Sequence, residues 1–153
     1  MLIFVISALV ILIDQGSKWI VRSNMQVGET VPIWNHILQF THYENSGAAF
    51  SSFQGYGKYF VLIAVVFVAG LIYYRRKGEI KGVLMETAAG FLAGGAIGNA
   101  IDRLVFHKVT DFLVFGKSNG ILNLADVAIN IGVILFIIHL LKGQLKLKLK
   151  PKS

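Results

Sequence analysis

Aspartate and asparagine side chains recur near the ends of the most apolar segments of this 153-residue chain. Asn123, Asp126 and Asn130 fall at positions i, i+3 and i+7, which places them on one stripe of a helix. Asp111 lies in the connection just before that helix. Two carboxylates held close together in low dielectric cannot both ionise easily, so one keeps a proton. Such a pair can activate water and polarise a carbonyl without a metal or a covalent intermediate.

Two other apolar segments carry polar residues of the same kind. Asp14 and Lys18 are four residues apart and share a helical face, while Asn99 and Asp102 are three apart and Arg103 follows them. Taken singly, these residues could be an interfacial ion pair, the end of a span, or hydrogen-bond partners between helices. An ionisable residue inside a membrane span is costly and normally faces the protein interior. We therefore predict that these groups converge on one site.

The composition is that of an integral membrane protein. Hydrophobic residues make up 55% of the chain, charged residues 15%, and the mean hydropathy is +0.65, whereas soluble domains carry roughly a quarter charged residues. These values exclude a secreted disulfide scaffold, a disordered tail and a nucleic-acid-binding domain, despite a net charge of +7. The chain has no cysteine for thiolate chemistry, and its histidines show no metal-ligand spacing. We expect no metal and no cofactor.

The pattern of apolar runs predicts an all-α polytopic membrane protein with four transmembrane helices, folded as a single domain over residues 1–153. A bilayer needs about 20 apolar residues per helix. The segments that qualify cover about residues 2–21, 59–74, 83–104 and 122–141. Gly90, Gly94 and Gly98 follow a small-xxx-small pattern that lets helices approach closely.

The connection between the first two helices, about residues 28–56, is rich in β-branched and aromatic residues. It predicts a small β-rich segment on the extracytoplasmic side. Its aromatic side chains would suit either the headgroup level of the membrane or a platform over a site. They are Trp34, Tyr43, Phe50, Phe53 and Tyr56.

Basic residues predict the orientation. The short connection 75–82 and the tail 142–153 hold nine of the fifteen lysines and arginines. Both lie on one side if there are four spans, and the positive-inside rule places that side in the cytoplasm. We therefore expect cytoplasmic termini, and the polar groups described above near the outer face of a cytoplasmic membrane.

Five short sequences follow one another along the chain in a characteristic order. They are "DQGSK" at 14–18, "NSGAAFS" at 45–51, "GGAIGNAIDR" at 94–103, "VTDF" at 109–112 and "NLADVAIN" at 123–130. In this order, on four spans, they resemble the motifs of the bacterial lipoprotein signal peptidase family, the type II signal peptidases. The resemblance covers most of the chain.

The resemblance implies an intramembrane aspartyl endopeptidase. Such enzymes remove the signal peptide from prolipoproteins, cutting before a cysteine that already carries diacylglycerol, and are the target of the cyclic peptide globomycin. By motif, Asp111 and Asp126 are implied as the catalytic pair, with Asp102 as the rival for one place. Substrate-contacting or supporting positions are expected at Asp14, Lys18, Asn45, Gly47, Asn99, Asp102, Arg103, Asn123 and Asn130.

The expected partners are diacylglyceryl-prolipoproteins, membrane lipid and globomycin-type inhibitors, with no nucleic acid, and the chain is expected to be a monomer. An extended substrate could pair with an exposed strand edge in "ILQFTHY" at 37–43. The alternative function is a small proton- or ion-coupled transporter, because membrane carboxylates often mark ion paths. Such a path should carry polar groups at several depths, whereas here the inner halves of the spans are almost purely apolar apart from Glu86.

Overall fold

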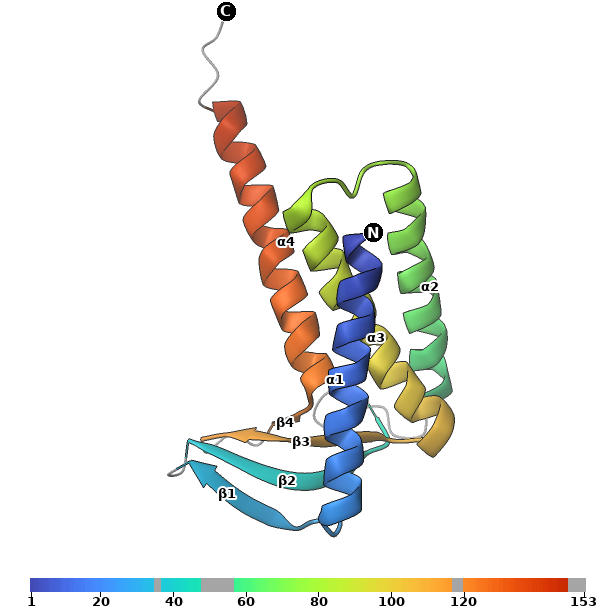
Figure 1. Cartoon of the computed structure of the whole chain (residues 1–153), viewed down its shortest axis with the longest axis vertical. Coiled ribbons are helices and arrows are strands. Elements are labelled where there is room, and N and C mark those ends of the chain that lie inside the picture. Colours follow the sequence, from blue (N-terminus) through green and yellow to red (C-terminus); the bar gives the residue numbers. More distant parts are fainter. Residues whose placement is uncertain (35–36, 48–56, 117–119, 149–153) are drawn as a thin grey trace, which may run out of the picture.

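The structure is a computed structural model of the chain, and it describes residues 1–34, 37–47, 57–116 and 120–148, with residues 144–148 described as backbone only. Within these residues four helices form a bundle, and four strands form a sheet across one end of it (Figure 1). The helices are α1 (Leu2–Asn24), α2 (Gly57–Arg76), α3 (Val83–Phe106) and α4 (Leu124–Lys148). The strands are β1 (Thr30–Trp34), β2 (Leu38–Asn45), β3 (Val109–Phe115) and β4 (Ile121–Leu122).

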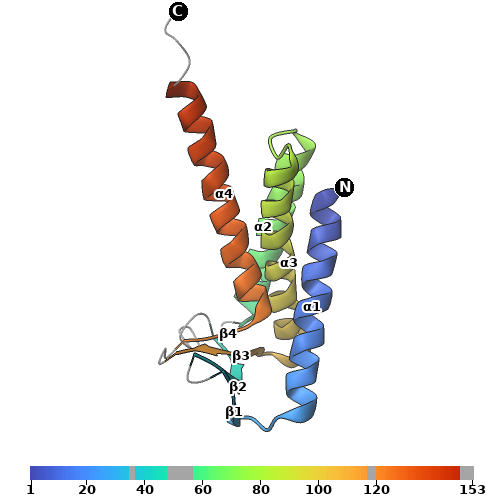
Figure 2. The same cartoon turned by 60° about the vertical axis from the view of Figure 1, so that its left-hand side comes forward.

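Helix α3 is the centre of the bundle and packs against α1, α2 and α4. Its glycines make this close packing possible. A Cβ atom on Gly94 would lie 2.7 Å from Cβ of Val10 in α1, and one on Gly95 would lie 2.5 Å from the carbonyl oxygen of Ala125 in α4. Helix α2 stands at the periphery and has no buried residue, in keeping with its position in Figures 1 and 2.

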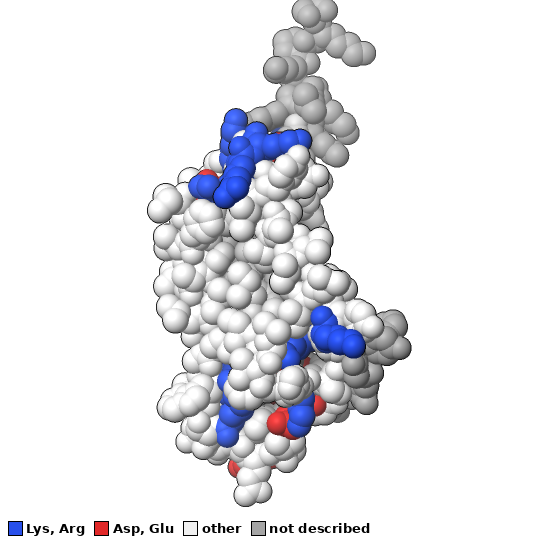
Figure 3. Space-filling view, turned by 90° about the vertical axis from the view of Figure 1, so that its right-hand side faces the viewer, with Lys and Arg blue, Asp and Glu red and all other residues white. Residues whose placement is uncertain are grey.

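Three helices in the described part of the chain are long and apolar enough to cross a membrane: α1, α2 and the Leu124–Gly143 portion of α4. Helix α3 is also long, at 24 residues, but it is not one of these three helices. Its central position favours glycine, alanine and polar side chains over large aliphatic ones, which lowers its hydropathy. Lys and Arg side chains gather at the bundle end remote from the sheet, where α2 meets α3, and a largely uncharged zone separates them from the charges near the sheet (Figure 3).

The sheet is antiparallel with the strand order β1-β2-β3-β4. Its composition differs from the sequence-based expectation, which placed strands only between the first two helices. Two of the four strands come from the connection between α3 and α4. Strand β2 is paired on both sides, so "ILQFTHY" offers no free edge and the edge-pairing hypothesis for that segment is wrong.

Some boundaries also differ. Helix α4 begins at Leu124 rather than near residue 122, because Ile121 and Leu122 pair with Val114 and Leu113 as strand β4. At its other end α4 continues to Lys148, into the segment expected to be a tail. Of the aromatic residues expected at the membrane surface, Trp34 is exposed, whereas Phe50, Phe53 and Tyr56 lie outside the described residues.

Candidate active site

Asp111 lies on β3 and is held by two amide side chains. Its Oδ1 accepts a hydrogen bond of 2.6 Å from Nδ2 of Asn123, and its Oδ2 accepts one of 3.0 Å from Nδ2 of Asn45. Asn45 is the last residue of β2, and strand pairing sets Tyr43 opposite Asp111. The pairing of β2 with β3 therefore brings together residues that are 66 positions apart.

Asp126 lies in the first turn of α4, where its position is fixed by a reciprocal cap. The backbone N–H of Asp126 donates to Oδ1 of Asn123 at 2.9 Å, and the backbone N–H of Asn123 donates to Oδ2 of Asp126 at 3.2 Å. This is a capping box with aspartate in the third helical position. Nδ2 of Asn99 donates to the other oxygen, Oδ1, at 2.8 Å. A helix N-terminus stabilises a negative charge at such a position.

The two aspartates line one cavity of about 240 Å³ between the sheet and the ends of α3 and α4. Asn123 connects them, because it donates to Asp111 and also caps the turn that carries Asp126. Four more of the predicted site residues line the same cavity: Asn45, Asn99, Arg103 and Asn130. Strand β4 contributes Ile121 and Leu122 to its wall.

A second group of predicted residues forms a buried ion network beside the cavity. Nζ of Lys18 lies 2.9 Å from Oδ2 of Asp14 and 3.3 Å from Oδ2 of Asp102, and all three side chains are fully buried. Asp14 accepts a bond of 2.8 Å from the backbone N–H of Ala125, at the start of α4. Asp102 accepts one of 3.0 Å from the backbone N–H of Thr110, next to Asp111.

Asp102 is not among the described residues that line the cavity. Its bond with the backbone of Thr110 supports the strand that carries Asp111. Asn99 joins the network to the aspartate pair, since its Oδ1 accepts from both Lys18 (3.0 Å) and Asn123 (3.1 Å). Removing one member of a buried charged network leaves the others uncompensated, so the network fixes the relative positions of β3 and α4.

Arg103 and Gly47 form the side of the site that leads toward α2. Nη2 of Arg103 donates to the carbonyl oxygen of Gly47 at 3.0 Å, and Nη1 donates to the carbonyl oxygen of Asn99 at 3.2 Å. The backbone N–H of Gly47 donates to Oδ1 of Asn45 at 2.9 Å. Among the described residues, Nε of Arg103 is buried without a hydrogen-bond partner, and the guanidinium lies 5.1 Å from the ring centre of Phe60.

Burial raises the pKa of Asp111 to about 6. Asp111 is only 3% exposed, and loss of hydration disfavours the charged form of its side chain. The hydrogen bond from Asn45 lowers this pKa and the nearby charge of Asp126 raises it, with smaller effects from Asn123 and Lys18. Burial therefore favours the protonated form of Asp111.

Sequence reasoning missed three residues that contribute to this arrangement: Gln15, Arg22 and Thr110. Nε2 of Gln15 bonds both Asp14 (3.1 Å) and Asp102 (3.1 Å). Nη1 of Arg22 lies 3.5 Å from Asp102 and donates to Oγ1 of Thr110 at 3.0 Å. The signal for Arg22 was present, because it continues the four-residue spacing of Asp14 and Lys18.

The arrangement suits hydrolysis by two carboxylates. Two carboxylates share a cavity with amide donors, beside an arginine, at the end of an apolar bundle. In the described residues no group of three or more histidine, cysteine, aspartate or glutamate side chains is placed to hold a metal ion.

Comparisons with known proteins agree with this chemistry. The chain matches the family described as "Signal peptidase (SPase) II" over residues 6–142. It is similar to a bacterial membrane enzyme solved by the in meso method at 2.3 Å resolution, with 33% identity, a TM-score of 0.90, and coverage of 99% of this chain and 94% of that one. A second bacterial membrane enzyme, solved by the same method at 1.9 Å, shares 34% identity with a TM-score of 0.84, covering 92% of each chain.

Proposed function

This chain belongs to the signal peptidase II family, and we propose that Asp111 and Asp126 are the catalytic pair with which it cleaves lipoprotein precursors. The family and the structural similarity support a lipoprotein signal peptidase and give no support to an ion-coupled transporter. The observation that carries the assignment of the pair is their shared cavity, in which Asn123 binds both aspartates.

In the proposed reaction Asp126 is the general base and Asp111 the general acid. Asp126 takes a proton from water, the water oxygen attacks the scissile carbonyl carbon, and Asp111 donates its proton to the carbonyl oxygen. Asp126 then passes its proton to the amide nitrogen, the C–N bond breaks, and Asp111 takes back a proton from a hydroxyl group as the carboxyl product forms. The capped start of α4 favours the charge on Asp126, and the raised pKa of Asp111 favours the proton there.

The remaining predicted residues have two proposed roles. Asn45, Asn99, Asn123 and Asn130, together with Arg103 and Gly47, border the space for the substrate backbone or hold the aspartates. Asp14, Lys18 and Asp102 are the support beneath them. Strand β4 is the sheet edge beside the cavity, so an extended substrate would pair with Ile121–Leu122.

We propose that α3 is a fourth membrane span. At 1.5 Å per residue its 24 residues extend about 36 Å, enough to cross the hydrocarbon core, and it is surrounded by three helices that qualify by hydropathy. The basic end of the bundle then faces the cytoplasm with both termini, and the sheet and the catalytic pair face outward. We propose a monomeric enzyme that takes diacylglyceryl-prolipoproteins and is inhibited by globomycin-type peptides.

Cleavage of a diacylglyceryl-modified prolipoprotein in detergent tests this assignment. Asp111→Asn and Asp126→Asn should each lower kcat by about a thousandfold, with little change in the unfolding temperature. Glu44→Gln is the matched control, because this carboxylate lies on the same sheet and pairs with Lys108 in an exposed ion pair, and it should keep full activity. Full activity of either aspartate variant would remove that residue from the pair.

A further inference from the structure

One end of the sheet projects sideways past the helix bundle on the side of α4 (Figures 1 and 2). At this end β1 and β3 finish and β2 begins. Among the described residues, four large apolar side chains are exposed there, and we refer to them as the sheet tip. They are Ile33 (51% exposed), Trp34 (62%), Ile37 (52%) and Phe115 (49%).

Trp34 and Phe115 of the sheet tip lie on the sheet face that carries Asp111. Trp34 is paired with Leu38, and Leu38 with Phe115, so these three side chains form a row across the sheet. Successive side chains of a strand alternate between faces, which places Asp111 and Phe115 on the same face of β3. They are four positions apart, or about 13 Å along the strand.

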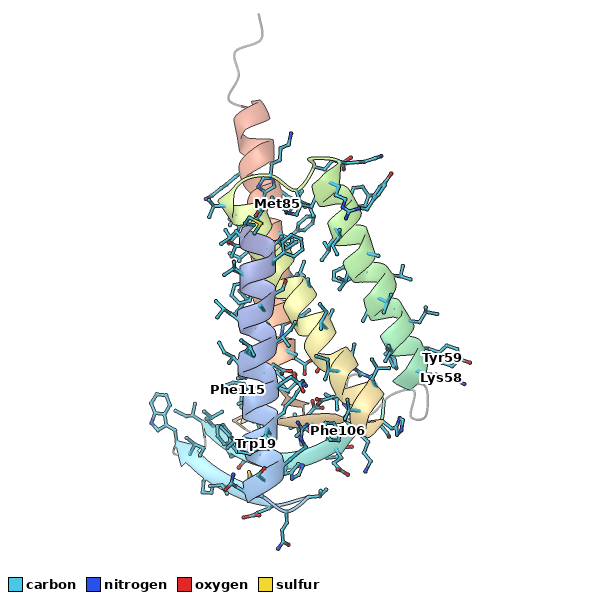
Figure 4. All side chains as sticks on the ribbon, turned by 45° about the vertical axis from the view of Figure 1, so that its right-hand side comes forward. Trp19, Lys58, Tyr59, Met85, Phe106 and Phe115 are labelled. Atoms are coloured by element: carbon cyan, nitrogen blue, oxygen red, sulfur yellow. The ribbon has the colours of Figure 1, made fainter. Side chains whose placement is uncertain are left out.

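The start of the candidate span in α4 shows how close the sheet lies to the apolar part of the bundle. Its candidate span covers Leu124–Gly143 and starts two residues after β4 ends at Leu122. The sheet therefore borders directly on the part of the bundle that is apolar enough to lie in lipid. Trp19 on α1, which is 64% exposed, and Phe115 on β3 are both found toward this end of the bundle (Figure 4).

We propose that the sheet tip lies in the interfacial layer of the bilayer, so that the face carrying Asp111 continues directly into lipid. Its residue types fit this layer, since tryptophan is enriched at membrane interfaces and aliphatic side chains enter the acyl boundary. The bilayer leaflet is the outer one if the proposed orientation of the enzyme holds.

Where the structure describes it, the backbone at the tip is compatible with such a position. Polar groups must be paired where water is scarce. The N–H of Ile37 donates to the carbonyl oxygen of Trp34 at 2.7 Å, and the N–H of Gly116 donates to that of Ile37 at 2.8 Å. Gly116 adopts a φ of 60°, a conformation that glycine adopts readily. A substrate lipid on the outer leaflet would then reach the catalytic face without leaving the membrane surface.

Tryptophan fluorescence can test this position, because the chain contains two tryptophans. Trp19→Phe leaves Trp34 as the only emitter, and Trp34→Phe leaves Trp19 as a matched reference. Each full-length variant is placed in vesicles of phosphatidylcholine and phosphatidylglycerol, with or without phosphatidylcholine brominated near the headgroup end of its acyl chains. We expect the brominated lipid to lower Trp34 emission about twofold or more, comparably to Trp19.

Three outcomes would overturn the proposal. Efficient quenching of Trp34 by aqueous acrylamide, with none by brominated lipid, would place the tip in water. Protection from both quenchers would indicate a protein contact, such as a second copy of the chain. Quenching only by a prolipoprotein with brominated acyl chains would make the tip a substrate site. Since the measurement needs no turnover, an inactive chain with a lipid-quenched Trp34 would count against the proposed function alone.

Discussion

We expect the proton on Asp111 to set the pH dependence of the proposed catalytic pair. Loss of the last proton from the pair leaves two charges and no general acid. With the pKa of Asp111 raised to about 6 by burial, kcat/KM should fall as the pH rises above about 6. Removing the hydrogen bond of Asn45, which lowers this pKa, should move the fall to higher pH. We expect Asn45→Leu to raise the pH at which kcat/KM falls by about half to one pH unit.

The measurement is kcat/KM between acid and alkaline pH for the wild type and Asn45→Leu. Asn24→Leu serves as the control, since its side chain bonds the carbonyl oxygen of Ile20 at the exposed end of α1. If kcat/KM of Asn45→Leu falls at the same pH as that of the wild type, or at a lower pH, then Asp111 does not supply the proton.

Arg22 is a candidate positioning residue for Asp111. It joins Thr110, the neighbour of Asp111, to Asp102, and its guanidinium stacks 4.3 Å from the ring centre of Phe106. Small misplacements of a catalytic group can cost much of the rate. Arg22→Met should therefore lower kcat about five- to tenfold with a smaller effect on KM, and Thr110→Val, which keeps the backbone bond to Asp102, should do the same.

Combining the two substitutions checks that they act through one contact. The double variant should be no slower than the worse single variant, because coupled residues are not additive. Arg22→Lys should restore part of the rate. Lys108→Met, which removes an exposed ion pair with Glu44, should have no effect. Additive losses in kcat, or equal losses in KM alone, would assign Arg22 a different role.

The carboxylates of the site could be found from sequence, whereas their partners could be found only in part. Aspartates and asparagines in apolar segments are costly, so their spacing on α1, α3 and α4 is informative by itself. No such signal marks Thr110, because its role depends on the position of β3 beside α1, where Thr110 bonds Arg22. Asp102 shows the same limit, since its spacing leaves it a rival to Asp111 for a place in the pair. What distinguishes the two is that Asp111 lines the cavity, whereas Asp102 bonds the backbone of Thr110 and is not among the described lining residues.

At the scale of the elements, the contact between α3 and α4 sets the separation of the site residues. Gly95 is one helical turn before Asn99, which binds Asp126. A Cβ atom on Gly95 would meet the backbone of Ala125 at 2.5 Å, an obstacle that cannot rotate away. Gly95→Ala should lower stability by about 1–3 kcal/mol and reduce activity as well, because the helices must separate.

Gly70→Ala is the matched control for this substitution. Gly70 lies within α2, and an added Cβ would meet nothing within 4 Å. Alanine is the better helix former, so stability should be unchanged or rise by up to about 1 kcal/mol. Thermal unfolding of both variants in one detergent decides the matter. Equal unfolding temperatures would mean that the α3–α4 contact adjusts without cost.

The helices were predictable because each is a long apolar run, and the strands of the second connection were not. "VTDFLVF" is buried over Val109–Val114, so it lacks the alternation that marks a half-exposed strand. It becomes a strand through pairing with β2, a segment more than sixty residues earlier. Such non-local pairing leaves no local pattern, and the same cause placed the start of α4 two residues too early.

At the scale of the molecule, the fold divides into an apolar bundle with a basic end and a sheet at the opposite end (Figures 1 and 3). Figure 4 places Met85 near the basic end, and Lys58, Tyr59 and Phe106 near the sheet. The proposed catalytic pair lies where the bundle meets the sheet. If the sheet faces outward, as proposed, the pair lies at the outer end of the bundle.

The absence of cysteine makes that orientation directly measurable. Val27→Cys places a thiol in the exposed connection between α1 and β1, and Lys81→Cys places one in the exposed connection between α2 and α3. Four spans with a cytoplasmic basic end predict that a membrane-impermeant maleimide labels Val27→Cys in intact spheroplasts. Lys81→Cys should be labelled only after lysis, and both should react in detergent. Labelling of Lys81→Cys from outside would reverse the topology and place the catalytic pair on the cytoplasmic side, where a precursor anchored in the outer leaflet could not reach it.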